Sequence, residues 1–162
     1  MIDCVSYAPL PDYYSGILWS KLMGTSVLQA SSSDAMLRAY AHCSADHGGA
    51  TTVLLIHLDP SVPRTVLIDG LDLSQSLHEN ASGSATIQWH LTGPNGPNSS
   101  EVALNGRLLV AKVVAGGTEY DLPSLDGRIT PMQQEGGFIS VEMAPASIAF
   151  VELETPSGVC SP

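Results

Sequence analysis

Residues 51–58 read Thr-Thr-Val-Leu-Leu-Ile-His-Leu, an almost unbroken apolar run with the length of a single strand. A short apolar run that follows a Gly-rich break, here residues 44–50, is typical of a buried strand. The run is far shorter than the roughly 18 apolar residues that a membrane-spanning helix needs. The stretch therefore predicts the central strand of a β-sheet.

The segments around this run alternate between apolar and polar residues, which is the period of a half-buried strand. In residues 36–43 the pattern turns Tyr40 outward, and in residues 85–92 it turns Trp89 inward and His90 outward. The strands expected from the pattern are 26–30, 36–43, 51–58, 65–68, 85–92, a hairpin over 102–110 that turns at Asn105-Gly106, 138–143 and 147–153. Short strands separated by turn-forming residues predict a mainly β chain folded as a β-sandwich.

One helix precedes these strands and is predicted over residues 11–23. Pro11 suits its first turn, and Gly24 is placed to end it as the residue after the C-cap. One apolar face follows the helical period and consists of Tyr14, Ile17, Leu18 and Leu22. A single helix before an all-β domain either packs on the sandwich or belongs to something that this chain does not contain.

The composition limits the size and the partners of the protein. The 162 residues suit one domain and are too few for a (β/α)8 barrel, which takes about 250 residues. Six Lys and Arg stand against sixteen Asp and Glu, which gives a net charge of −10. This charge argues against nucleic acid, anionic membranes and sulfated polyanions as partners, because the chain offers them few cations.

No catalytic, cofactor or metal site is predicted from the residues themselves. His42, His47 and His57 match no zinc-binding spacing, and no serine lies in a Gly-x-Ser-x-Gly motif. A glycosidase usually holds two carboxylates roughly 5–10 Å apart across a sugar. The glutamates lie mostly at strand ends, in turns or facing outward, and nothing directs two of them into one cleft: Glu79, Glu101, Glu119, Glu135, Glu142, Glu152 and Glu154.

The cysteines and the N-terminus leave the cellular compartment open. Cys4, Cys43 and Cys160 are an odd number, so they are either reduced thiols or one bond and one free thiol. Sequons at Asn80 and Asn98, in stretches rich in Gly, Ser and Pro, favour export and glycosylation. The first six residues lack the basic and apolar regions of a signal peptide.

The stretch Pro9–Gly24, with the sequence PLPDYYSGILWSKLMG, strongly resembles the heparanase family, glycoside hydrolase family 79. It is most similar to the plant heparanase-like proteins. Further similar motifs follow in family order: LRAYAHCS at 37–44, LLIHL at 54–58, HLT at 90–92, LNG at 104–106, LPSL at 122–125, PASIAFV at 145–151 and Cys160. Several motifs in one order are far more specific than any one of them.

The resemblance implies a longer parent enzyme in which a (β/α)8 barrel precedes a C-terminal β-sandwich. On this interpretation residues 1–25 are a remnant of the barrel with its last helix at 11–23, and residues 26–162 are the sandwich. The catalytic glutamates would lie in the missing barrel, which is the partner of this segment, so this chain alone should be inactive. The apolar face of the helix would be meant for that barrel, which would leave Ile17, Leu18 and Trp19 exposed.

The resemblance also implies a disulfide, a substrate class and a location. The C-terminal disulfide of the family corresponds to Cys43 and Cys160, whereas Cys4 matches nothing. The scattered cations differ from the basic clusters with which animal heparanases hold heparan sulfate, so a less charged glucuronide-containing glycan, such as a plant arabinogalactan, is expected. The family implies secretion to the exterior or cell wall, with a lysosomal, vacuolar or peripheral-membrane location as the alternatives.

Two other interpretations stay open. A freestanding sandwich could bind carbohydrate by stacking sugars on Trp89 or Tyr40, and the inward direction predicted for Trp89 leaves Tyr40 as the better candidate. The short chain could also be a truncated reading of a longer gene, with no function of its own.

Overall fold

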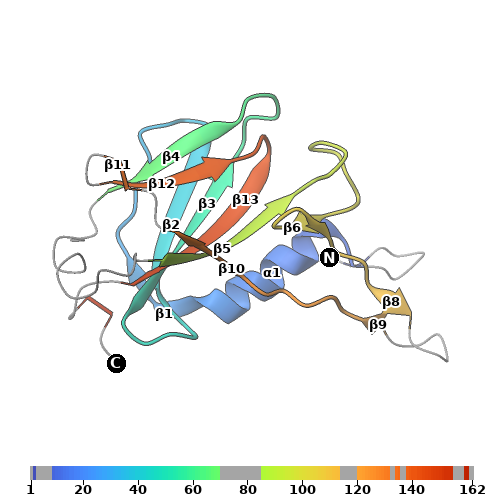
Figure 1. Cartoon of the computed structure of the whole chain (residues 1–162), viewed down its shortest axis with the longest axis horizontal. Helices are drawn as coiled ribbons and strands as arrows, with labels where there is room; N and C mark the ends of the chain where they lie inside the picture. Colours follow the sequence, from blue (N-terminus) through green and yellow to red (C-terminus); the bar gives the residue numbers. More distant parts are fainter. Residues whose placement is uncertain are drawn as a thin grey trace.

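A computed structural model describes residue 2 and residues 9–69, 85–113, 120–131, 134–135, 138–154 and 159–160. Its elements are helix α1 (Pro11–Leu22) and strands β1 (Met23–Leu28), β2 (Leu37–Ser44), β3 (Ala50–His57), β4 (Arg64–Ile68), β5 (Ala85–Thr92), β6 (Ala103–Leu104), β7 (Arg107–Leu108), β8 (Lys112–Val113), β9 (Tyr120–Asp121), β10 (Arg128–Pro131), β11 (Gln134–Glu135), β12 (Phe138–Met143) and β13 (Ser147–Glu154). Figure 1 shows a large sheet with β4 and β12 on one side and α1 on the other. The predicted mainly β fold with one preceding helix is confirmed.

The large sheet is antiparallel and has the order β1-β2-β3-β13-β5-β6-β7, with β10 also paired to β5. A small sheet has the order β11-β12-β4, and β8 pairs with β9. Strand β3 lies between β2 and β13, as its apolar sequence predicted. The short strands between residues 112 and 135 were not predicted, because this region has no clear apolar alternation and much of it reads as a break.

Two hydrophobic cores lie on opposite faces of the large sheet. The core between the two sheets consists of Leu37, Ala41, Val53, Leu55, Val66, Ile139, Val141, Met143, Ala149, Val151 and Leu153. The core beneath α1 consists of Tyr14, Leu18, Leu22, Met23, Leu54, Trp89, Leu91, Val102, Leu104, Leu109 and Phe150. Successive residues of β3 therefore enter different cores, which explains why its apolar run does not alternate.

Helix α1 packs on the large sheet, so the prediction that Leu18 would be exposed is wrong. Leu18 is 0% exposed, and Tyr14 and Leu22 are buried with it against Leu54 and Phe150. These three helical residues are spaced by four and form one stripe, which the sheet covers. Trp19 lies off this stripe and is 41% exposed, as predicted. That residues 1–25 belong to a barrel in a longer protein stays a prediction.

Gly24 follows the C-cap of α1, as predicted, but it does not end the helix in a left-handed conformation. The chain passes from α1 directly into β1, with Met23 at the C-cap in an extended conformation (φ −88°, ψ 107°). Gly24 therefore lies within β1, where an added Cβ would be 2.4 Å from the carbonyl oxygen of Cys43. Glycine is needed here because the backbones of β1 and β2 approach closely.

The hairpin turn at Asn105-Gly106 is confirmed, with φ angles of 51° and 80°. These positive values are those of a type I′ turn. The Asn105 side chain also holds the hairpin to β5, since its Oδ1 accepts from the His90 backbone N–H at 3.0 Å. Its Nδ2 donates to the Gln88 carbonyl oxygen at 3.0 Å.

Candidate functional site

The structure joins Cys43 of β2 to Cys160 by a disulfide with a Cα–Cα distance of 5.3 Å. The backbone N–H of Gly49 also donates to the Cys160 carbonyl oxygen at 3.0 Å. The bond links residues 117 positions apart and fixes the end of the chain beside the turn between β2 and β3. Cys4 lies outside the described residues.

Only one of the two sequon asparagines, Asn98, lies within the described residues. Asn98 is exposed in the turns between β5 and β6, where an acceptor for glycosylation must be accessible. Asn80 lies outside the described residues. Glycosylation at both positions stays a prediction.

The histidines considered as metal ligands have separate partners. Nδ1 of His42 lies 2.6 Å from the Gly24 carbonyl oxygen, and Nδ1 of His57 lies 2.9 Å from the Ala144 carbonyl oxygen. Nδ1 of His47 instead pairs with Oε1 of Glu152 at 2.7 Å. Within the described ranges, no three His, Cys, Asp or Glu side chains gather as a metal site.

Ser44, His47 and Glu152 form a polar cluster beside the disulfide, but their geometry is not that of a hydrolytic triad. Ser44 Oγ donates to Oε2 of Glu152 at 2.5 Å, whereas a nucleophilic serine would donate to the histidine ring. Glu152 is only 5% exposed and so is poorly accessible to a substrate. The cluster therefore ties β13 to the turn after β2 and activates no nucleophile.

The other glutamates whose side chains the structure describes also have structural partners. Glu101 accepts a hydrogen bond from Nδ2 of Asn95 at 3.0 Å, and Glu142 accepts from Oγ1 of Thr65 at 2.7 Å. Neither contact pairs two carboxylates as a glycosidase site would.

Trp89 is confirmed to point inward and is 4% exposed in the core beneath α1. Its Nε1 donates to the carbonyl oxygen of Leu125 at 3.0 Å, so its indole has no free face for a sugar. His90 faces the opposite side of β5, as predicted, and is half-buried there. Its Nε2 lies 3.0 Å from Ser147 Oγ, and burial lowers the pKa of its imidazole.

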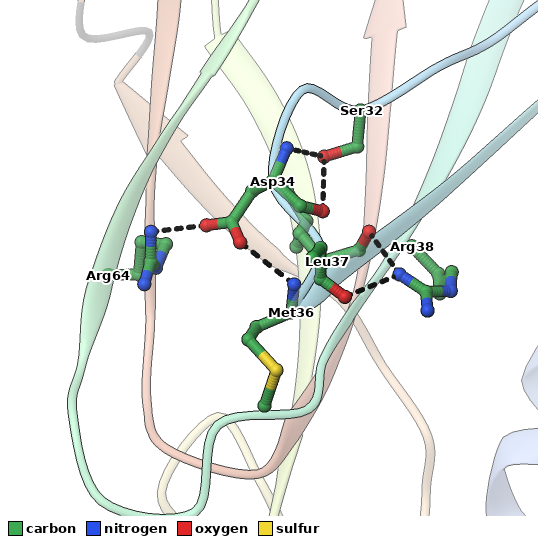
Figure 2. Close-up of polar contacts among 7 residues, drawn as sticks. Ser32, Asp34, Met36, Leu37, Arg38 and Arg64 are labelled. Carbon is green, nitrogen blue, oxygen red and sulfur yellow. Dashed lines mark hydrogen bonds and ion pairs between the residues drawn. The ribbon is translucent and has the colours of Figure 1, made fainter.

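An open depression of about 500 Å³ lies where the loop after β1 meets the start of β2. Its lining residues are Ser32, Ser33, Asp34, Ala35, Leu37, Arg38, Ala39 and Tyr40. Asp34 shapes this loop, since its Oδ1 accepts from the Met36 backbone N–H at 2.8 Å and its backbone N–H donates to Ser32 Oγ at 3.1 Å. Figure 2 shows these contacts and the ion pair of Asp34 with Arg64 of β4.

Two polar or aromatic side chains of β2 border this depression, Arg38 and Tyr40. Nη1 of Arg38 donates to the carbonyl oxygens of Ala35 at 2.8 Å and Leu37 at 3.1 Å (Figure 2). Tyr40 is 45% exposed, and its ring centroid lies 6.5 Å from that of Trp19 in an edge-to-face arrangement.

Sequence reasoning found Tyr40 but not the two residues that accompany it. The alternation of β2 places Arg38 on the same side as Tyr40, so this signal was available. Trp19 reaches Tyr40 only because α1 crosses this face of the sheet, and no local pattern gives that packing.

Comparisons with known proteins agree with this fold. No family model matches the chain. Baicalin-β-D-glucuronidase of Scutellaria baicalensis is 31% identical over 97% of this chain and 26% of its own length. Heparanase-like protein 1 of Arabidopsis thaliana is 31% identical over 94% of this chain and 31% of its own length. A solved structure, CelM2, a bifunctional glucanase-xylanase from a metagenome library, has a TM-score of 0.50 at 15% identity, over 90% of this chain and 22% of that one.

The structural likeness to CelM2 shows the fold alone, because the sequence identity is low. The sequence relatives match almost the whole chain, yet the chain spans only 26% and 31% of their lengths. These proportions are consistent with the C-terminal domain of a longer protein. No described helix is long and apolar enough to cross a membrane. The chain belongs to the heparanase-like family, glycoside hydrolase family 79.

Proposed function

We propose that this chain is the non-catalytic, C-terminal β-sandwich of a heparanase-like glycoside hydrolase. The parent enzyme would hydrolyse O-glycosyl bonds in glucuronide-containing glycans with glutamates of a preceding barrel. The observation that carries the proposal is the 31% identity to a β-D-glucuronidase over 97% of the chain, which spans only 26% of that relative. The described glutamates support it, because their contacts are structural.

The role of the sandwich would be to support the barrel. Helix α1 buries Tyr14, Leu18 and Leu22 in the large sheet, so a barrel that ends in α1 would be joined to the sandwich through a continuous core. The half-buried Ile17 lies off this stripe and is available to neighbouring parts of the parent. The same helix would thus belong to both domains.

Hydrolysis assays test this assignment. The purified 162-residue chain and the full-length parent are compared on a chromogenic β-D-glucuronide and on a glucuronide-containing arabinogalactan. We expect hydrolysis by the parent and none by the chain, because the carboxylate pair would lie outside it. Release of sugar by the chain alone, or inactivity of a folded parent on both substrates, would contradict the proposal.

We also propose that the parent is exported, since a disulfide and an exposed sequon suit an oxidising compartment. Expression through a eukaryotic secretory pathway should add a glycan at Asn98, which Asn98→Gln removes, with a matching fall in mass. An unmodified Asn98 in the secreted protein would contradict the proposed glycosylation, and failure of the parent to leave the cell would contradict export.

A second candidate function is carbohydrate binding by the sandwich itself. The exposure of Tyr40 beside a depression that contains an arginine favours it.

A further inference from the structure

We propose that the depression at the start of β2 binds an acidic saccharide through its uronate group. Tyr40, which Trp19 contacts from outside the depression, would supply the stacking surface and Arg38 would bind the carboxylate. This proposal rests on the proposed function only in the choice of a uronate-containing glycan as the natural ligand.

The aromatic part of the site is exposed and held in place. Tyr40 and Trp19 are 45% and 41% exposed, although side chains of this size usually lie largely buried. Their planes meet at 73° in an edge-to-face contact, so each ring helps to hold the other, and the exposed part of Tyr40 can receive the C–H face of a sugar. The His42 ring lies 5.4 Å from Trp19, and its contact with the Gly24 carbonyl fixes it there. A fixed surface loses little side-chain entropy when a ligand binds.

Arg38 supplies a charge that suits a carboxylate. Its Nη1 is occupied by the carbonyl oxygens of Ala35 and Leu37, which orient the guanidinium. Within the described residues Nη2 and Nε of Arg38 have no hydrogen-bond acceptor, and their donors can bind one carboxylate in a bidentate manner. Arg38 and Tyr40 are two residues apart on one side of β2, a spacing of about 6–7 Å. A pyranose ring stacked on Tyr40 could therefore place its carboxylate near Arg38.

The remaining residues of the depression do not oppose this ligand. Asp34 is the carboxylate that would repel a uronate, but it is already paired with Arg64 and accepts the backbone N–H of Met36. Ser33 is exposed and offers a hydroxyl to the sugar. The volume of about 500 Å³ lies within the range of small-ligand pockets. Charge, hydroxyl and aromatic groups thus gather in one accessible place.

A competing occupant is the rest of the parent polypeptide, which could cover Trp19 and Tyr40. The depression favours a saccharide, because burying Arg38 without a carboxylate partner would be unfavourable in a domain interface. A uronate supplies that partner, and its hydroxyls can also satisfy the polar lining.

NMR titration of the 162-residue chain tests the proposal, with methyl β-D-glucuronide and methyl β-D-glucoside as matched ligands. The two differ only in the carboxylate. We expect saturable shifts at Ser33, Arg38 and Tyr40 with a dissociation constant of about 1 mM for the glucuronide, and at least fivefold weaker binding of the glucoside. No saturable shift up to about 20 mM, or equal binding of both sugars, would overturn the proposal.

Variants of the chain test which side chains contact the sugar. Arg38→Gln should abolish the preference for the glucuronide, and Tyr40→Ala should weaken both sugars at least fivefold. The control is Arg128→Gln, an exposed arginine of β10 that lies outside the depression and should bind as the original chain does. Thermal unfolding confirms that each variant folds. Unchanged binding in both Arg38→Gln and Tyr40→Ala would contradict the site.

A separately produced barrel portion of the parent distinguishes the competing occupant. After its addition to the labelled chain, the glucuronide should still shift the NMR signals of Ser33, Arg38 and Tyr40. Blocked glucuronide binding in the presence of the barrel portion would contradict a functional saccharide site. Hydrolysis by the unmodified parent tests the proposed function independently, so loss of the site and loss of that function are distinguishable.

Discussion

The two ends of β2 carry similar kinds of side chains but differ in how those side chains are used. At its end, Ser44 and His47 bind Glu152, whose carboxylate is buried, and the adjacent disulfide closes the region. At its start, Arg38 and Tyr40 border an open depression and remain accessible. The comparison shows that a serine, a histidine and a glutamate in contact do not make a reactive site. Accessible groups with unused binding capacity are the better indication of a ligand.

The largest expected effect concerns the disulfide at the end of β2. Replacing both cysteines, Cys43→Ser with Cys160→Ser, should lower the free energy of unfolding by about 2–5 kcal/mol, because the bond constrains a long loop of the unfolded chain. Urea denaturation with and without reductant measures it. A non-reduced digest in which both thiols are free would show that the disulfide does not form. Identical unfolding midpoints for the original chain and the double variant would show that the disulfide does not stabilise the fold.

A similar effect is expected in the core beneath α1, the helix whose Trp19 contacts Tyr40 near the start of β2. Leu18→Ala should cost about 2–5 kcal/mol, since it leaves a cavity between the helix and the large sheet. Trp19→Ala is the matched control on the exposed side of the helix and should cost clearly less. Equal losses for the two variants, measured by urea denaturation, would mean that the helix does not pack as described.

Two glycines should respond oppositely to the same change. Gly24→Ala should destabilise by about 1–3 kcal/mol, because its Cβ would meet the Cys43 carbonyl at 2.4 Å. Gly16→Ala should stabilise by about 0.5–1 kcal/mol, since it lies within α1 with nothing within 4 Å of the added atom. Thermal unfolding of both variants checks the contrast, which a loss of stability at Gly16 would refute.

The smallest effect is a dependence on pH near His90. Burial lowers the pKa of this imidazole below its value of 6.5 in the unfolded chain. The unfolded chain therefore binds the proton more readily, so this contribution is complete above pH 6.5 and declines as the pH falls below it. Urea midpoints measured across this range should vary less in His90→Gln. Parallel profiles for the variant and the original chain would argue against the assignment.

The sequence predicted those features that depend on neighbouring residues. Alternation located most of the long strands and the direction of Trp89, and Asn105-Gly106 located the hairpin, because these signals are local. Packing between distant segments was not predictable in this way. The exposure of Leu18 was predicted wrongly and the close backbone approach at Gly24 was not predicted, because both depend on where α1 and β2 lie in space.

The candidate site was predicted only in part for the same reason. The alternation of residues in β2 predicted that Tyr40 points outward, but the contact with Trp19 joins elements separated by the whole of β1. The pair Asp34 and Arg64 likewise joins a loop to a strand that lies 30 positions later. Such sites become visible only when the fold brings the segments together.

Hydrogen exchange in α1 of the isolated 162-residue chain tests most directly whether the helix is a layer of this domain. We expect the amides around Leu18 and Leu22 to be protected about as strongly as those of β3, because both elements contribute to one core and open together. Exchange of these helical amides at the rate of an unfolded segment, with β3 still protected, would show that α1 is not a layer of this domain.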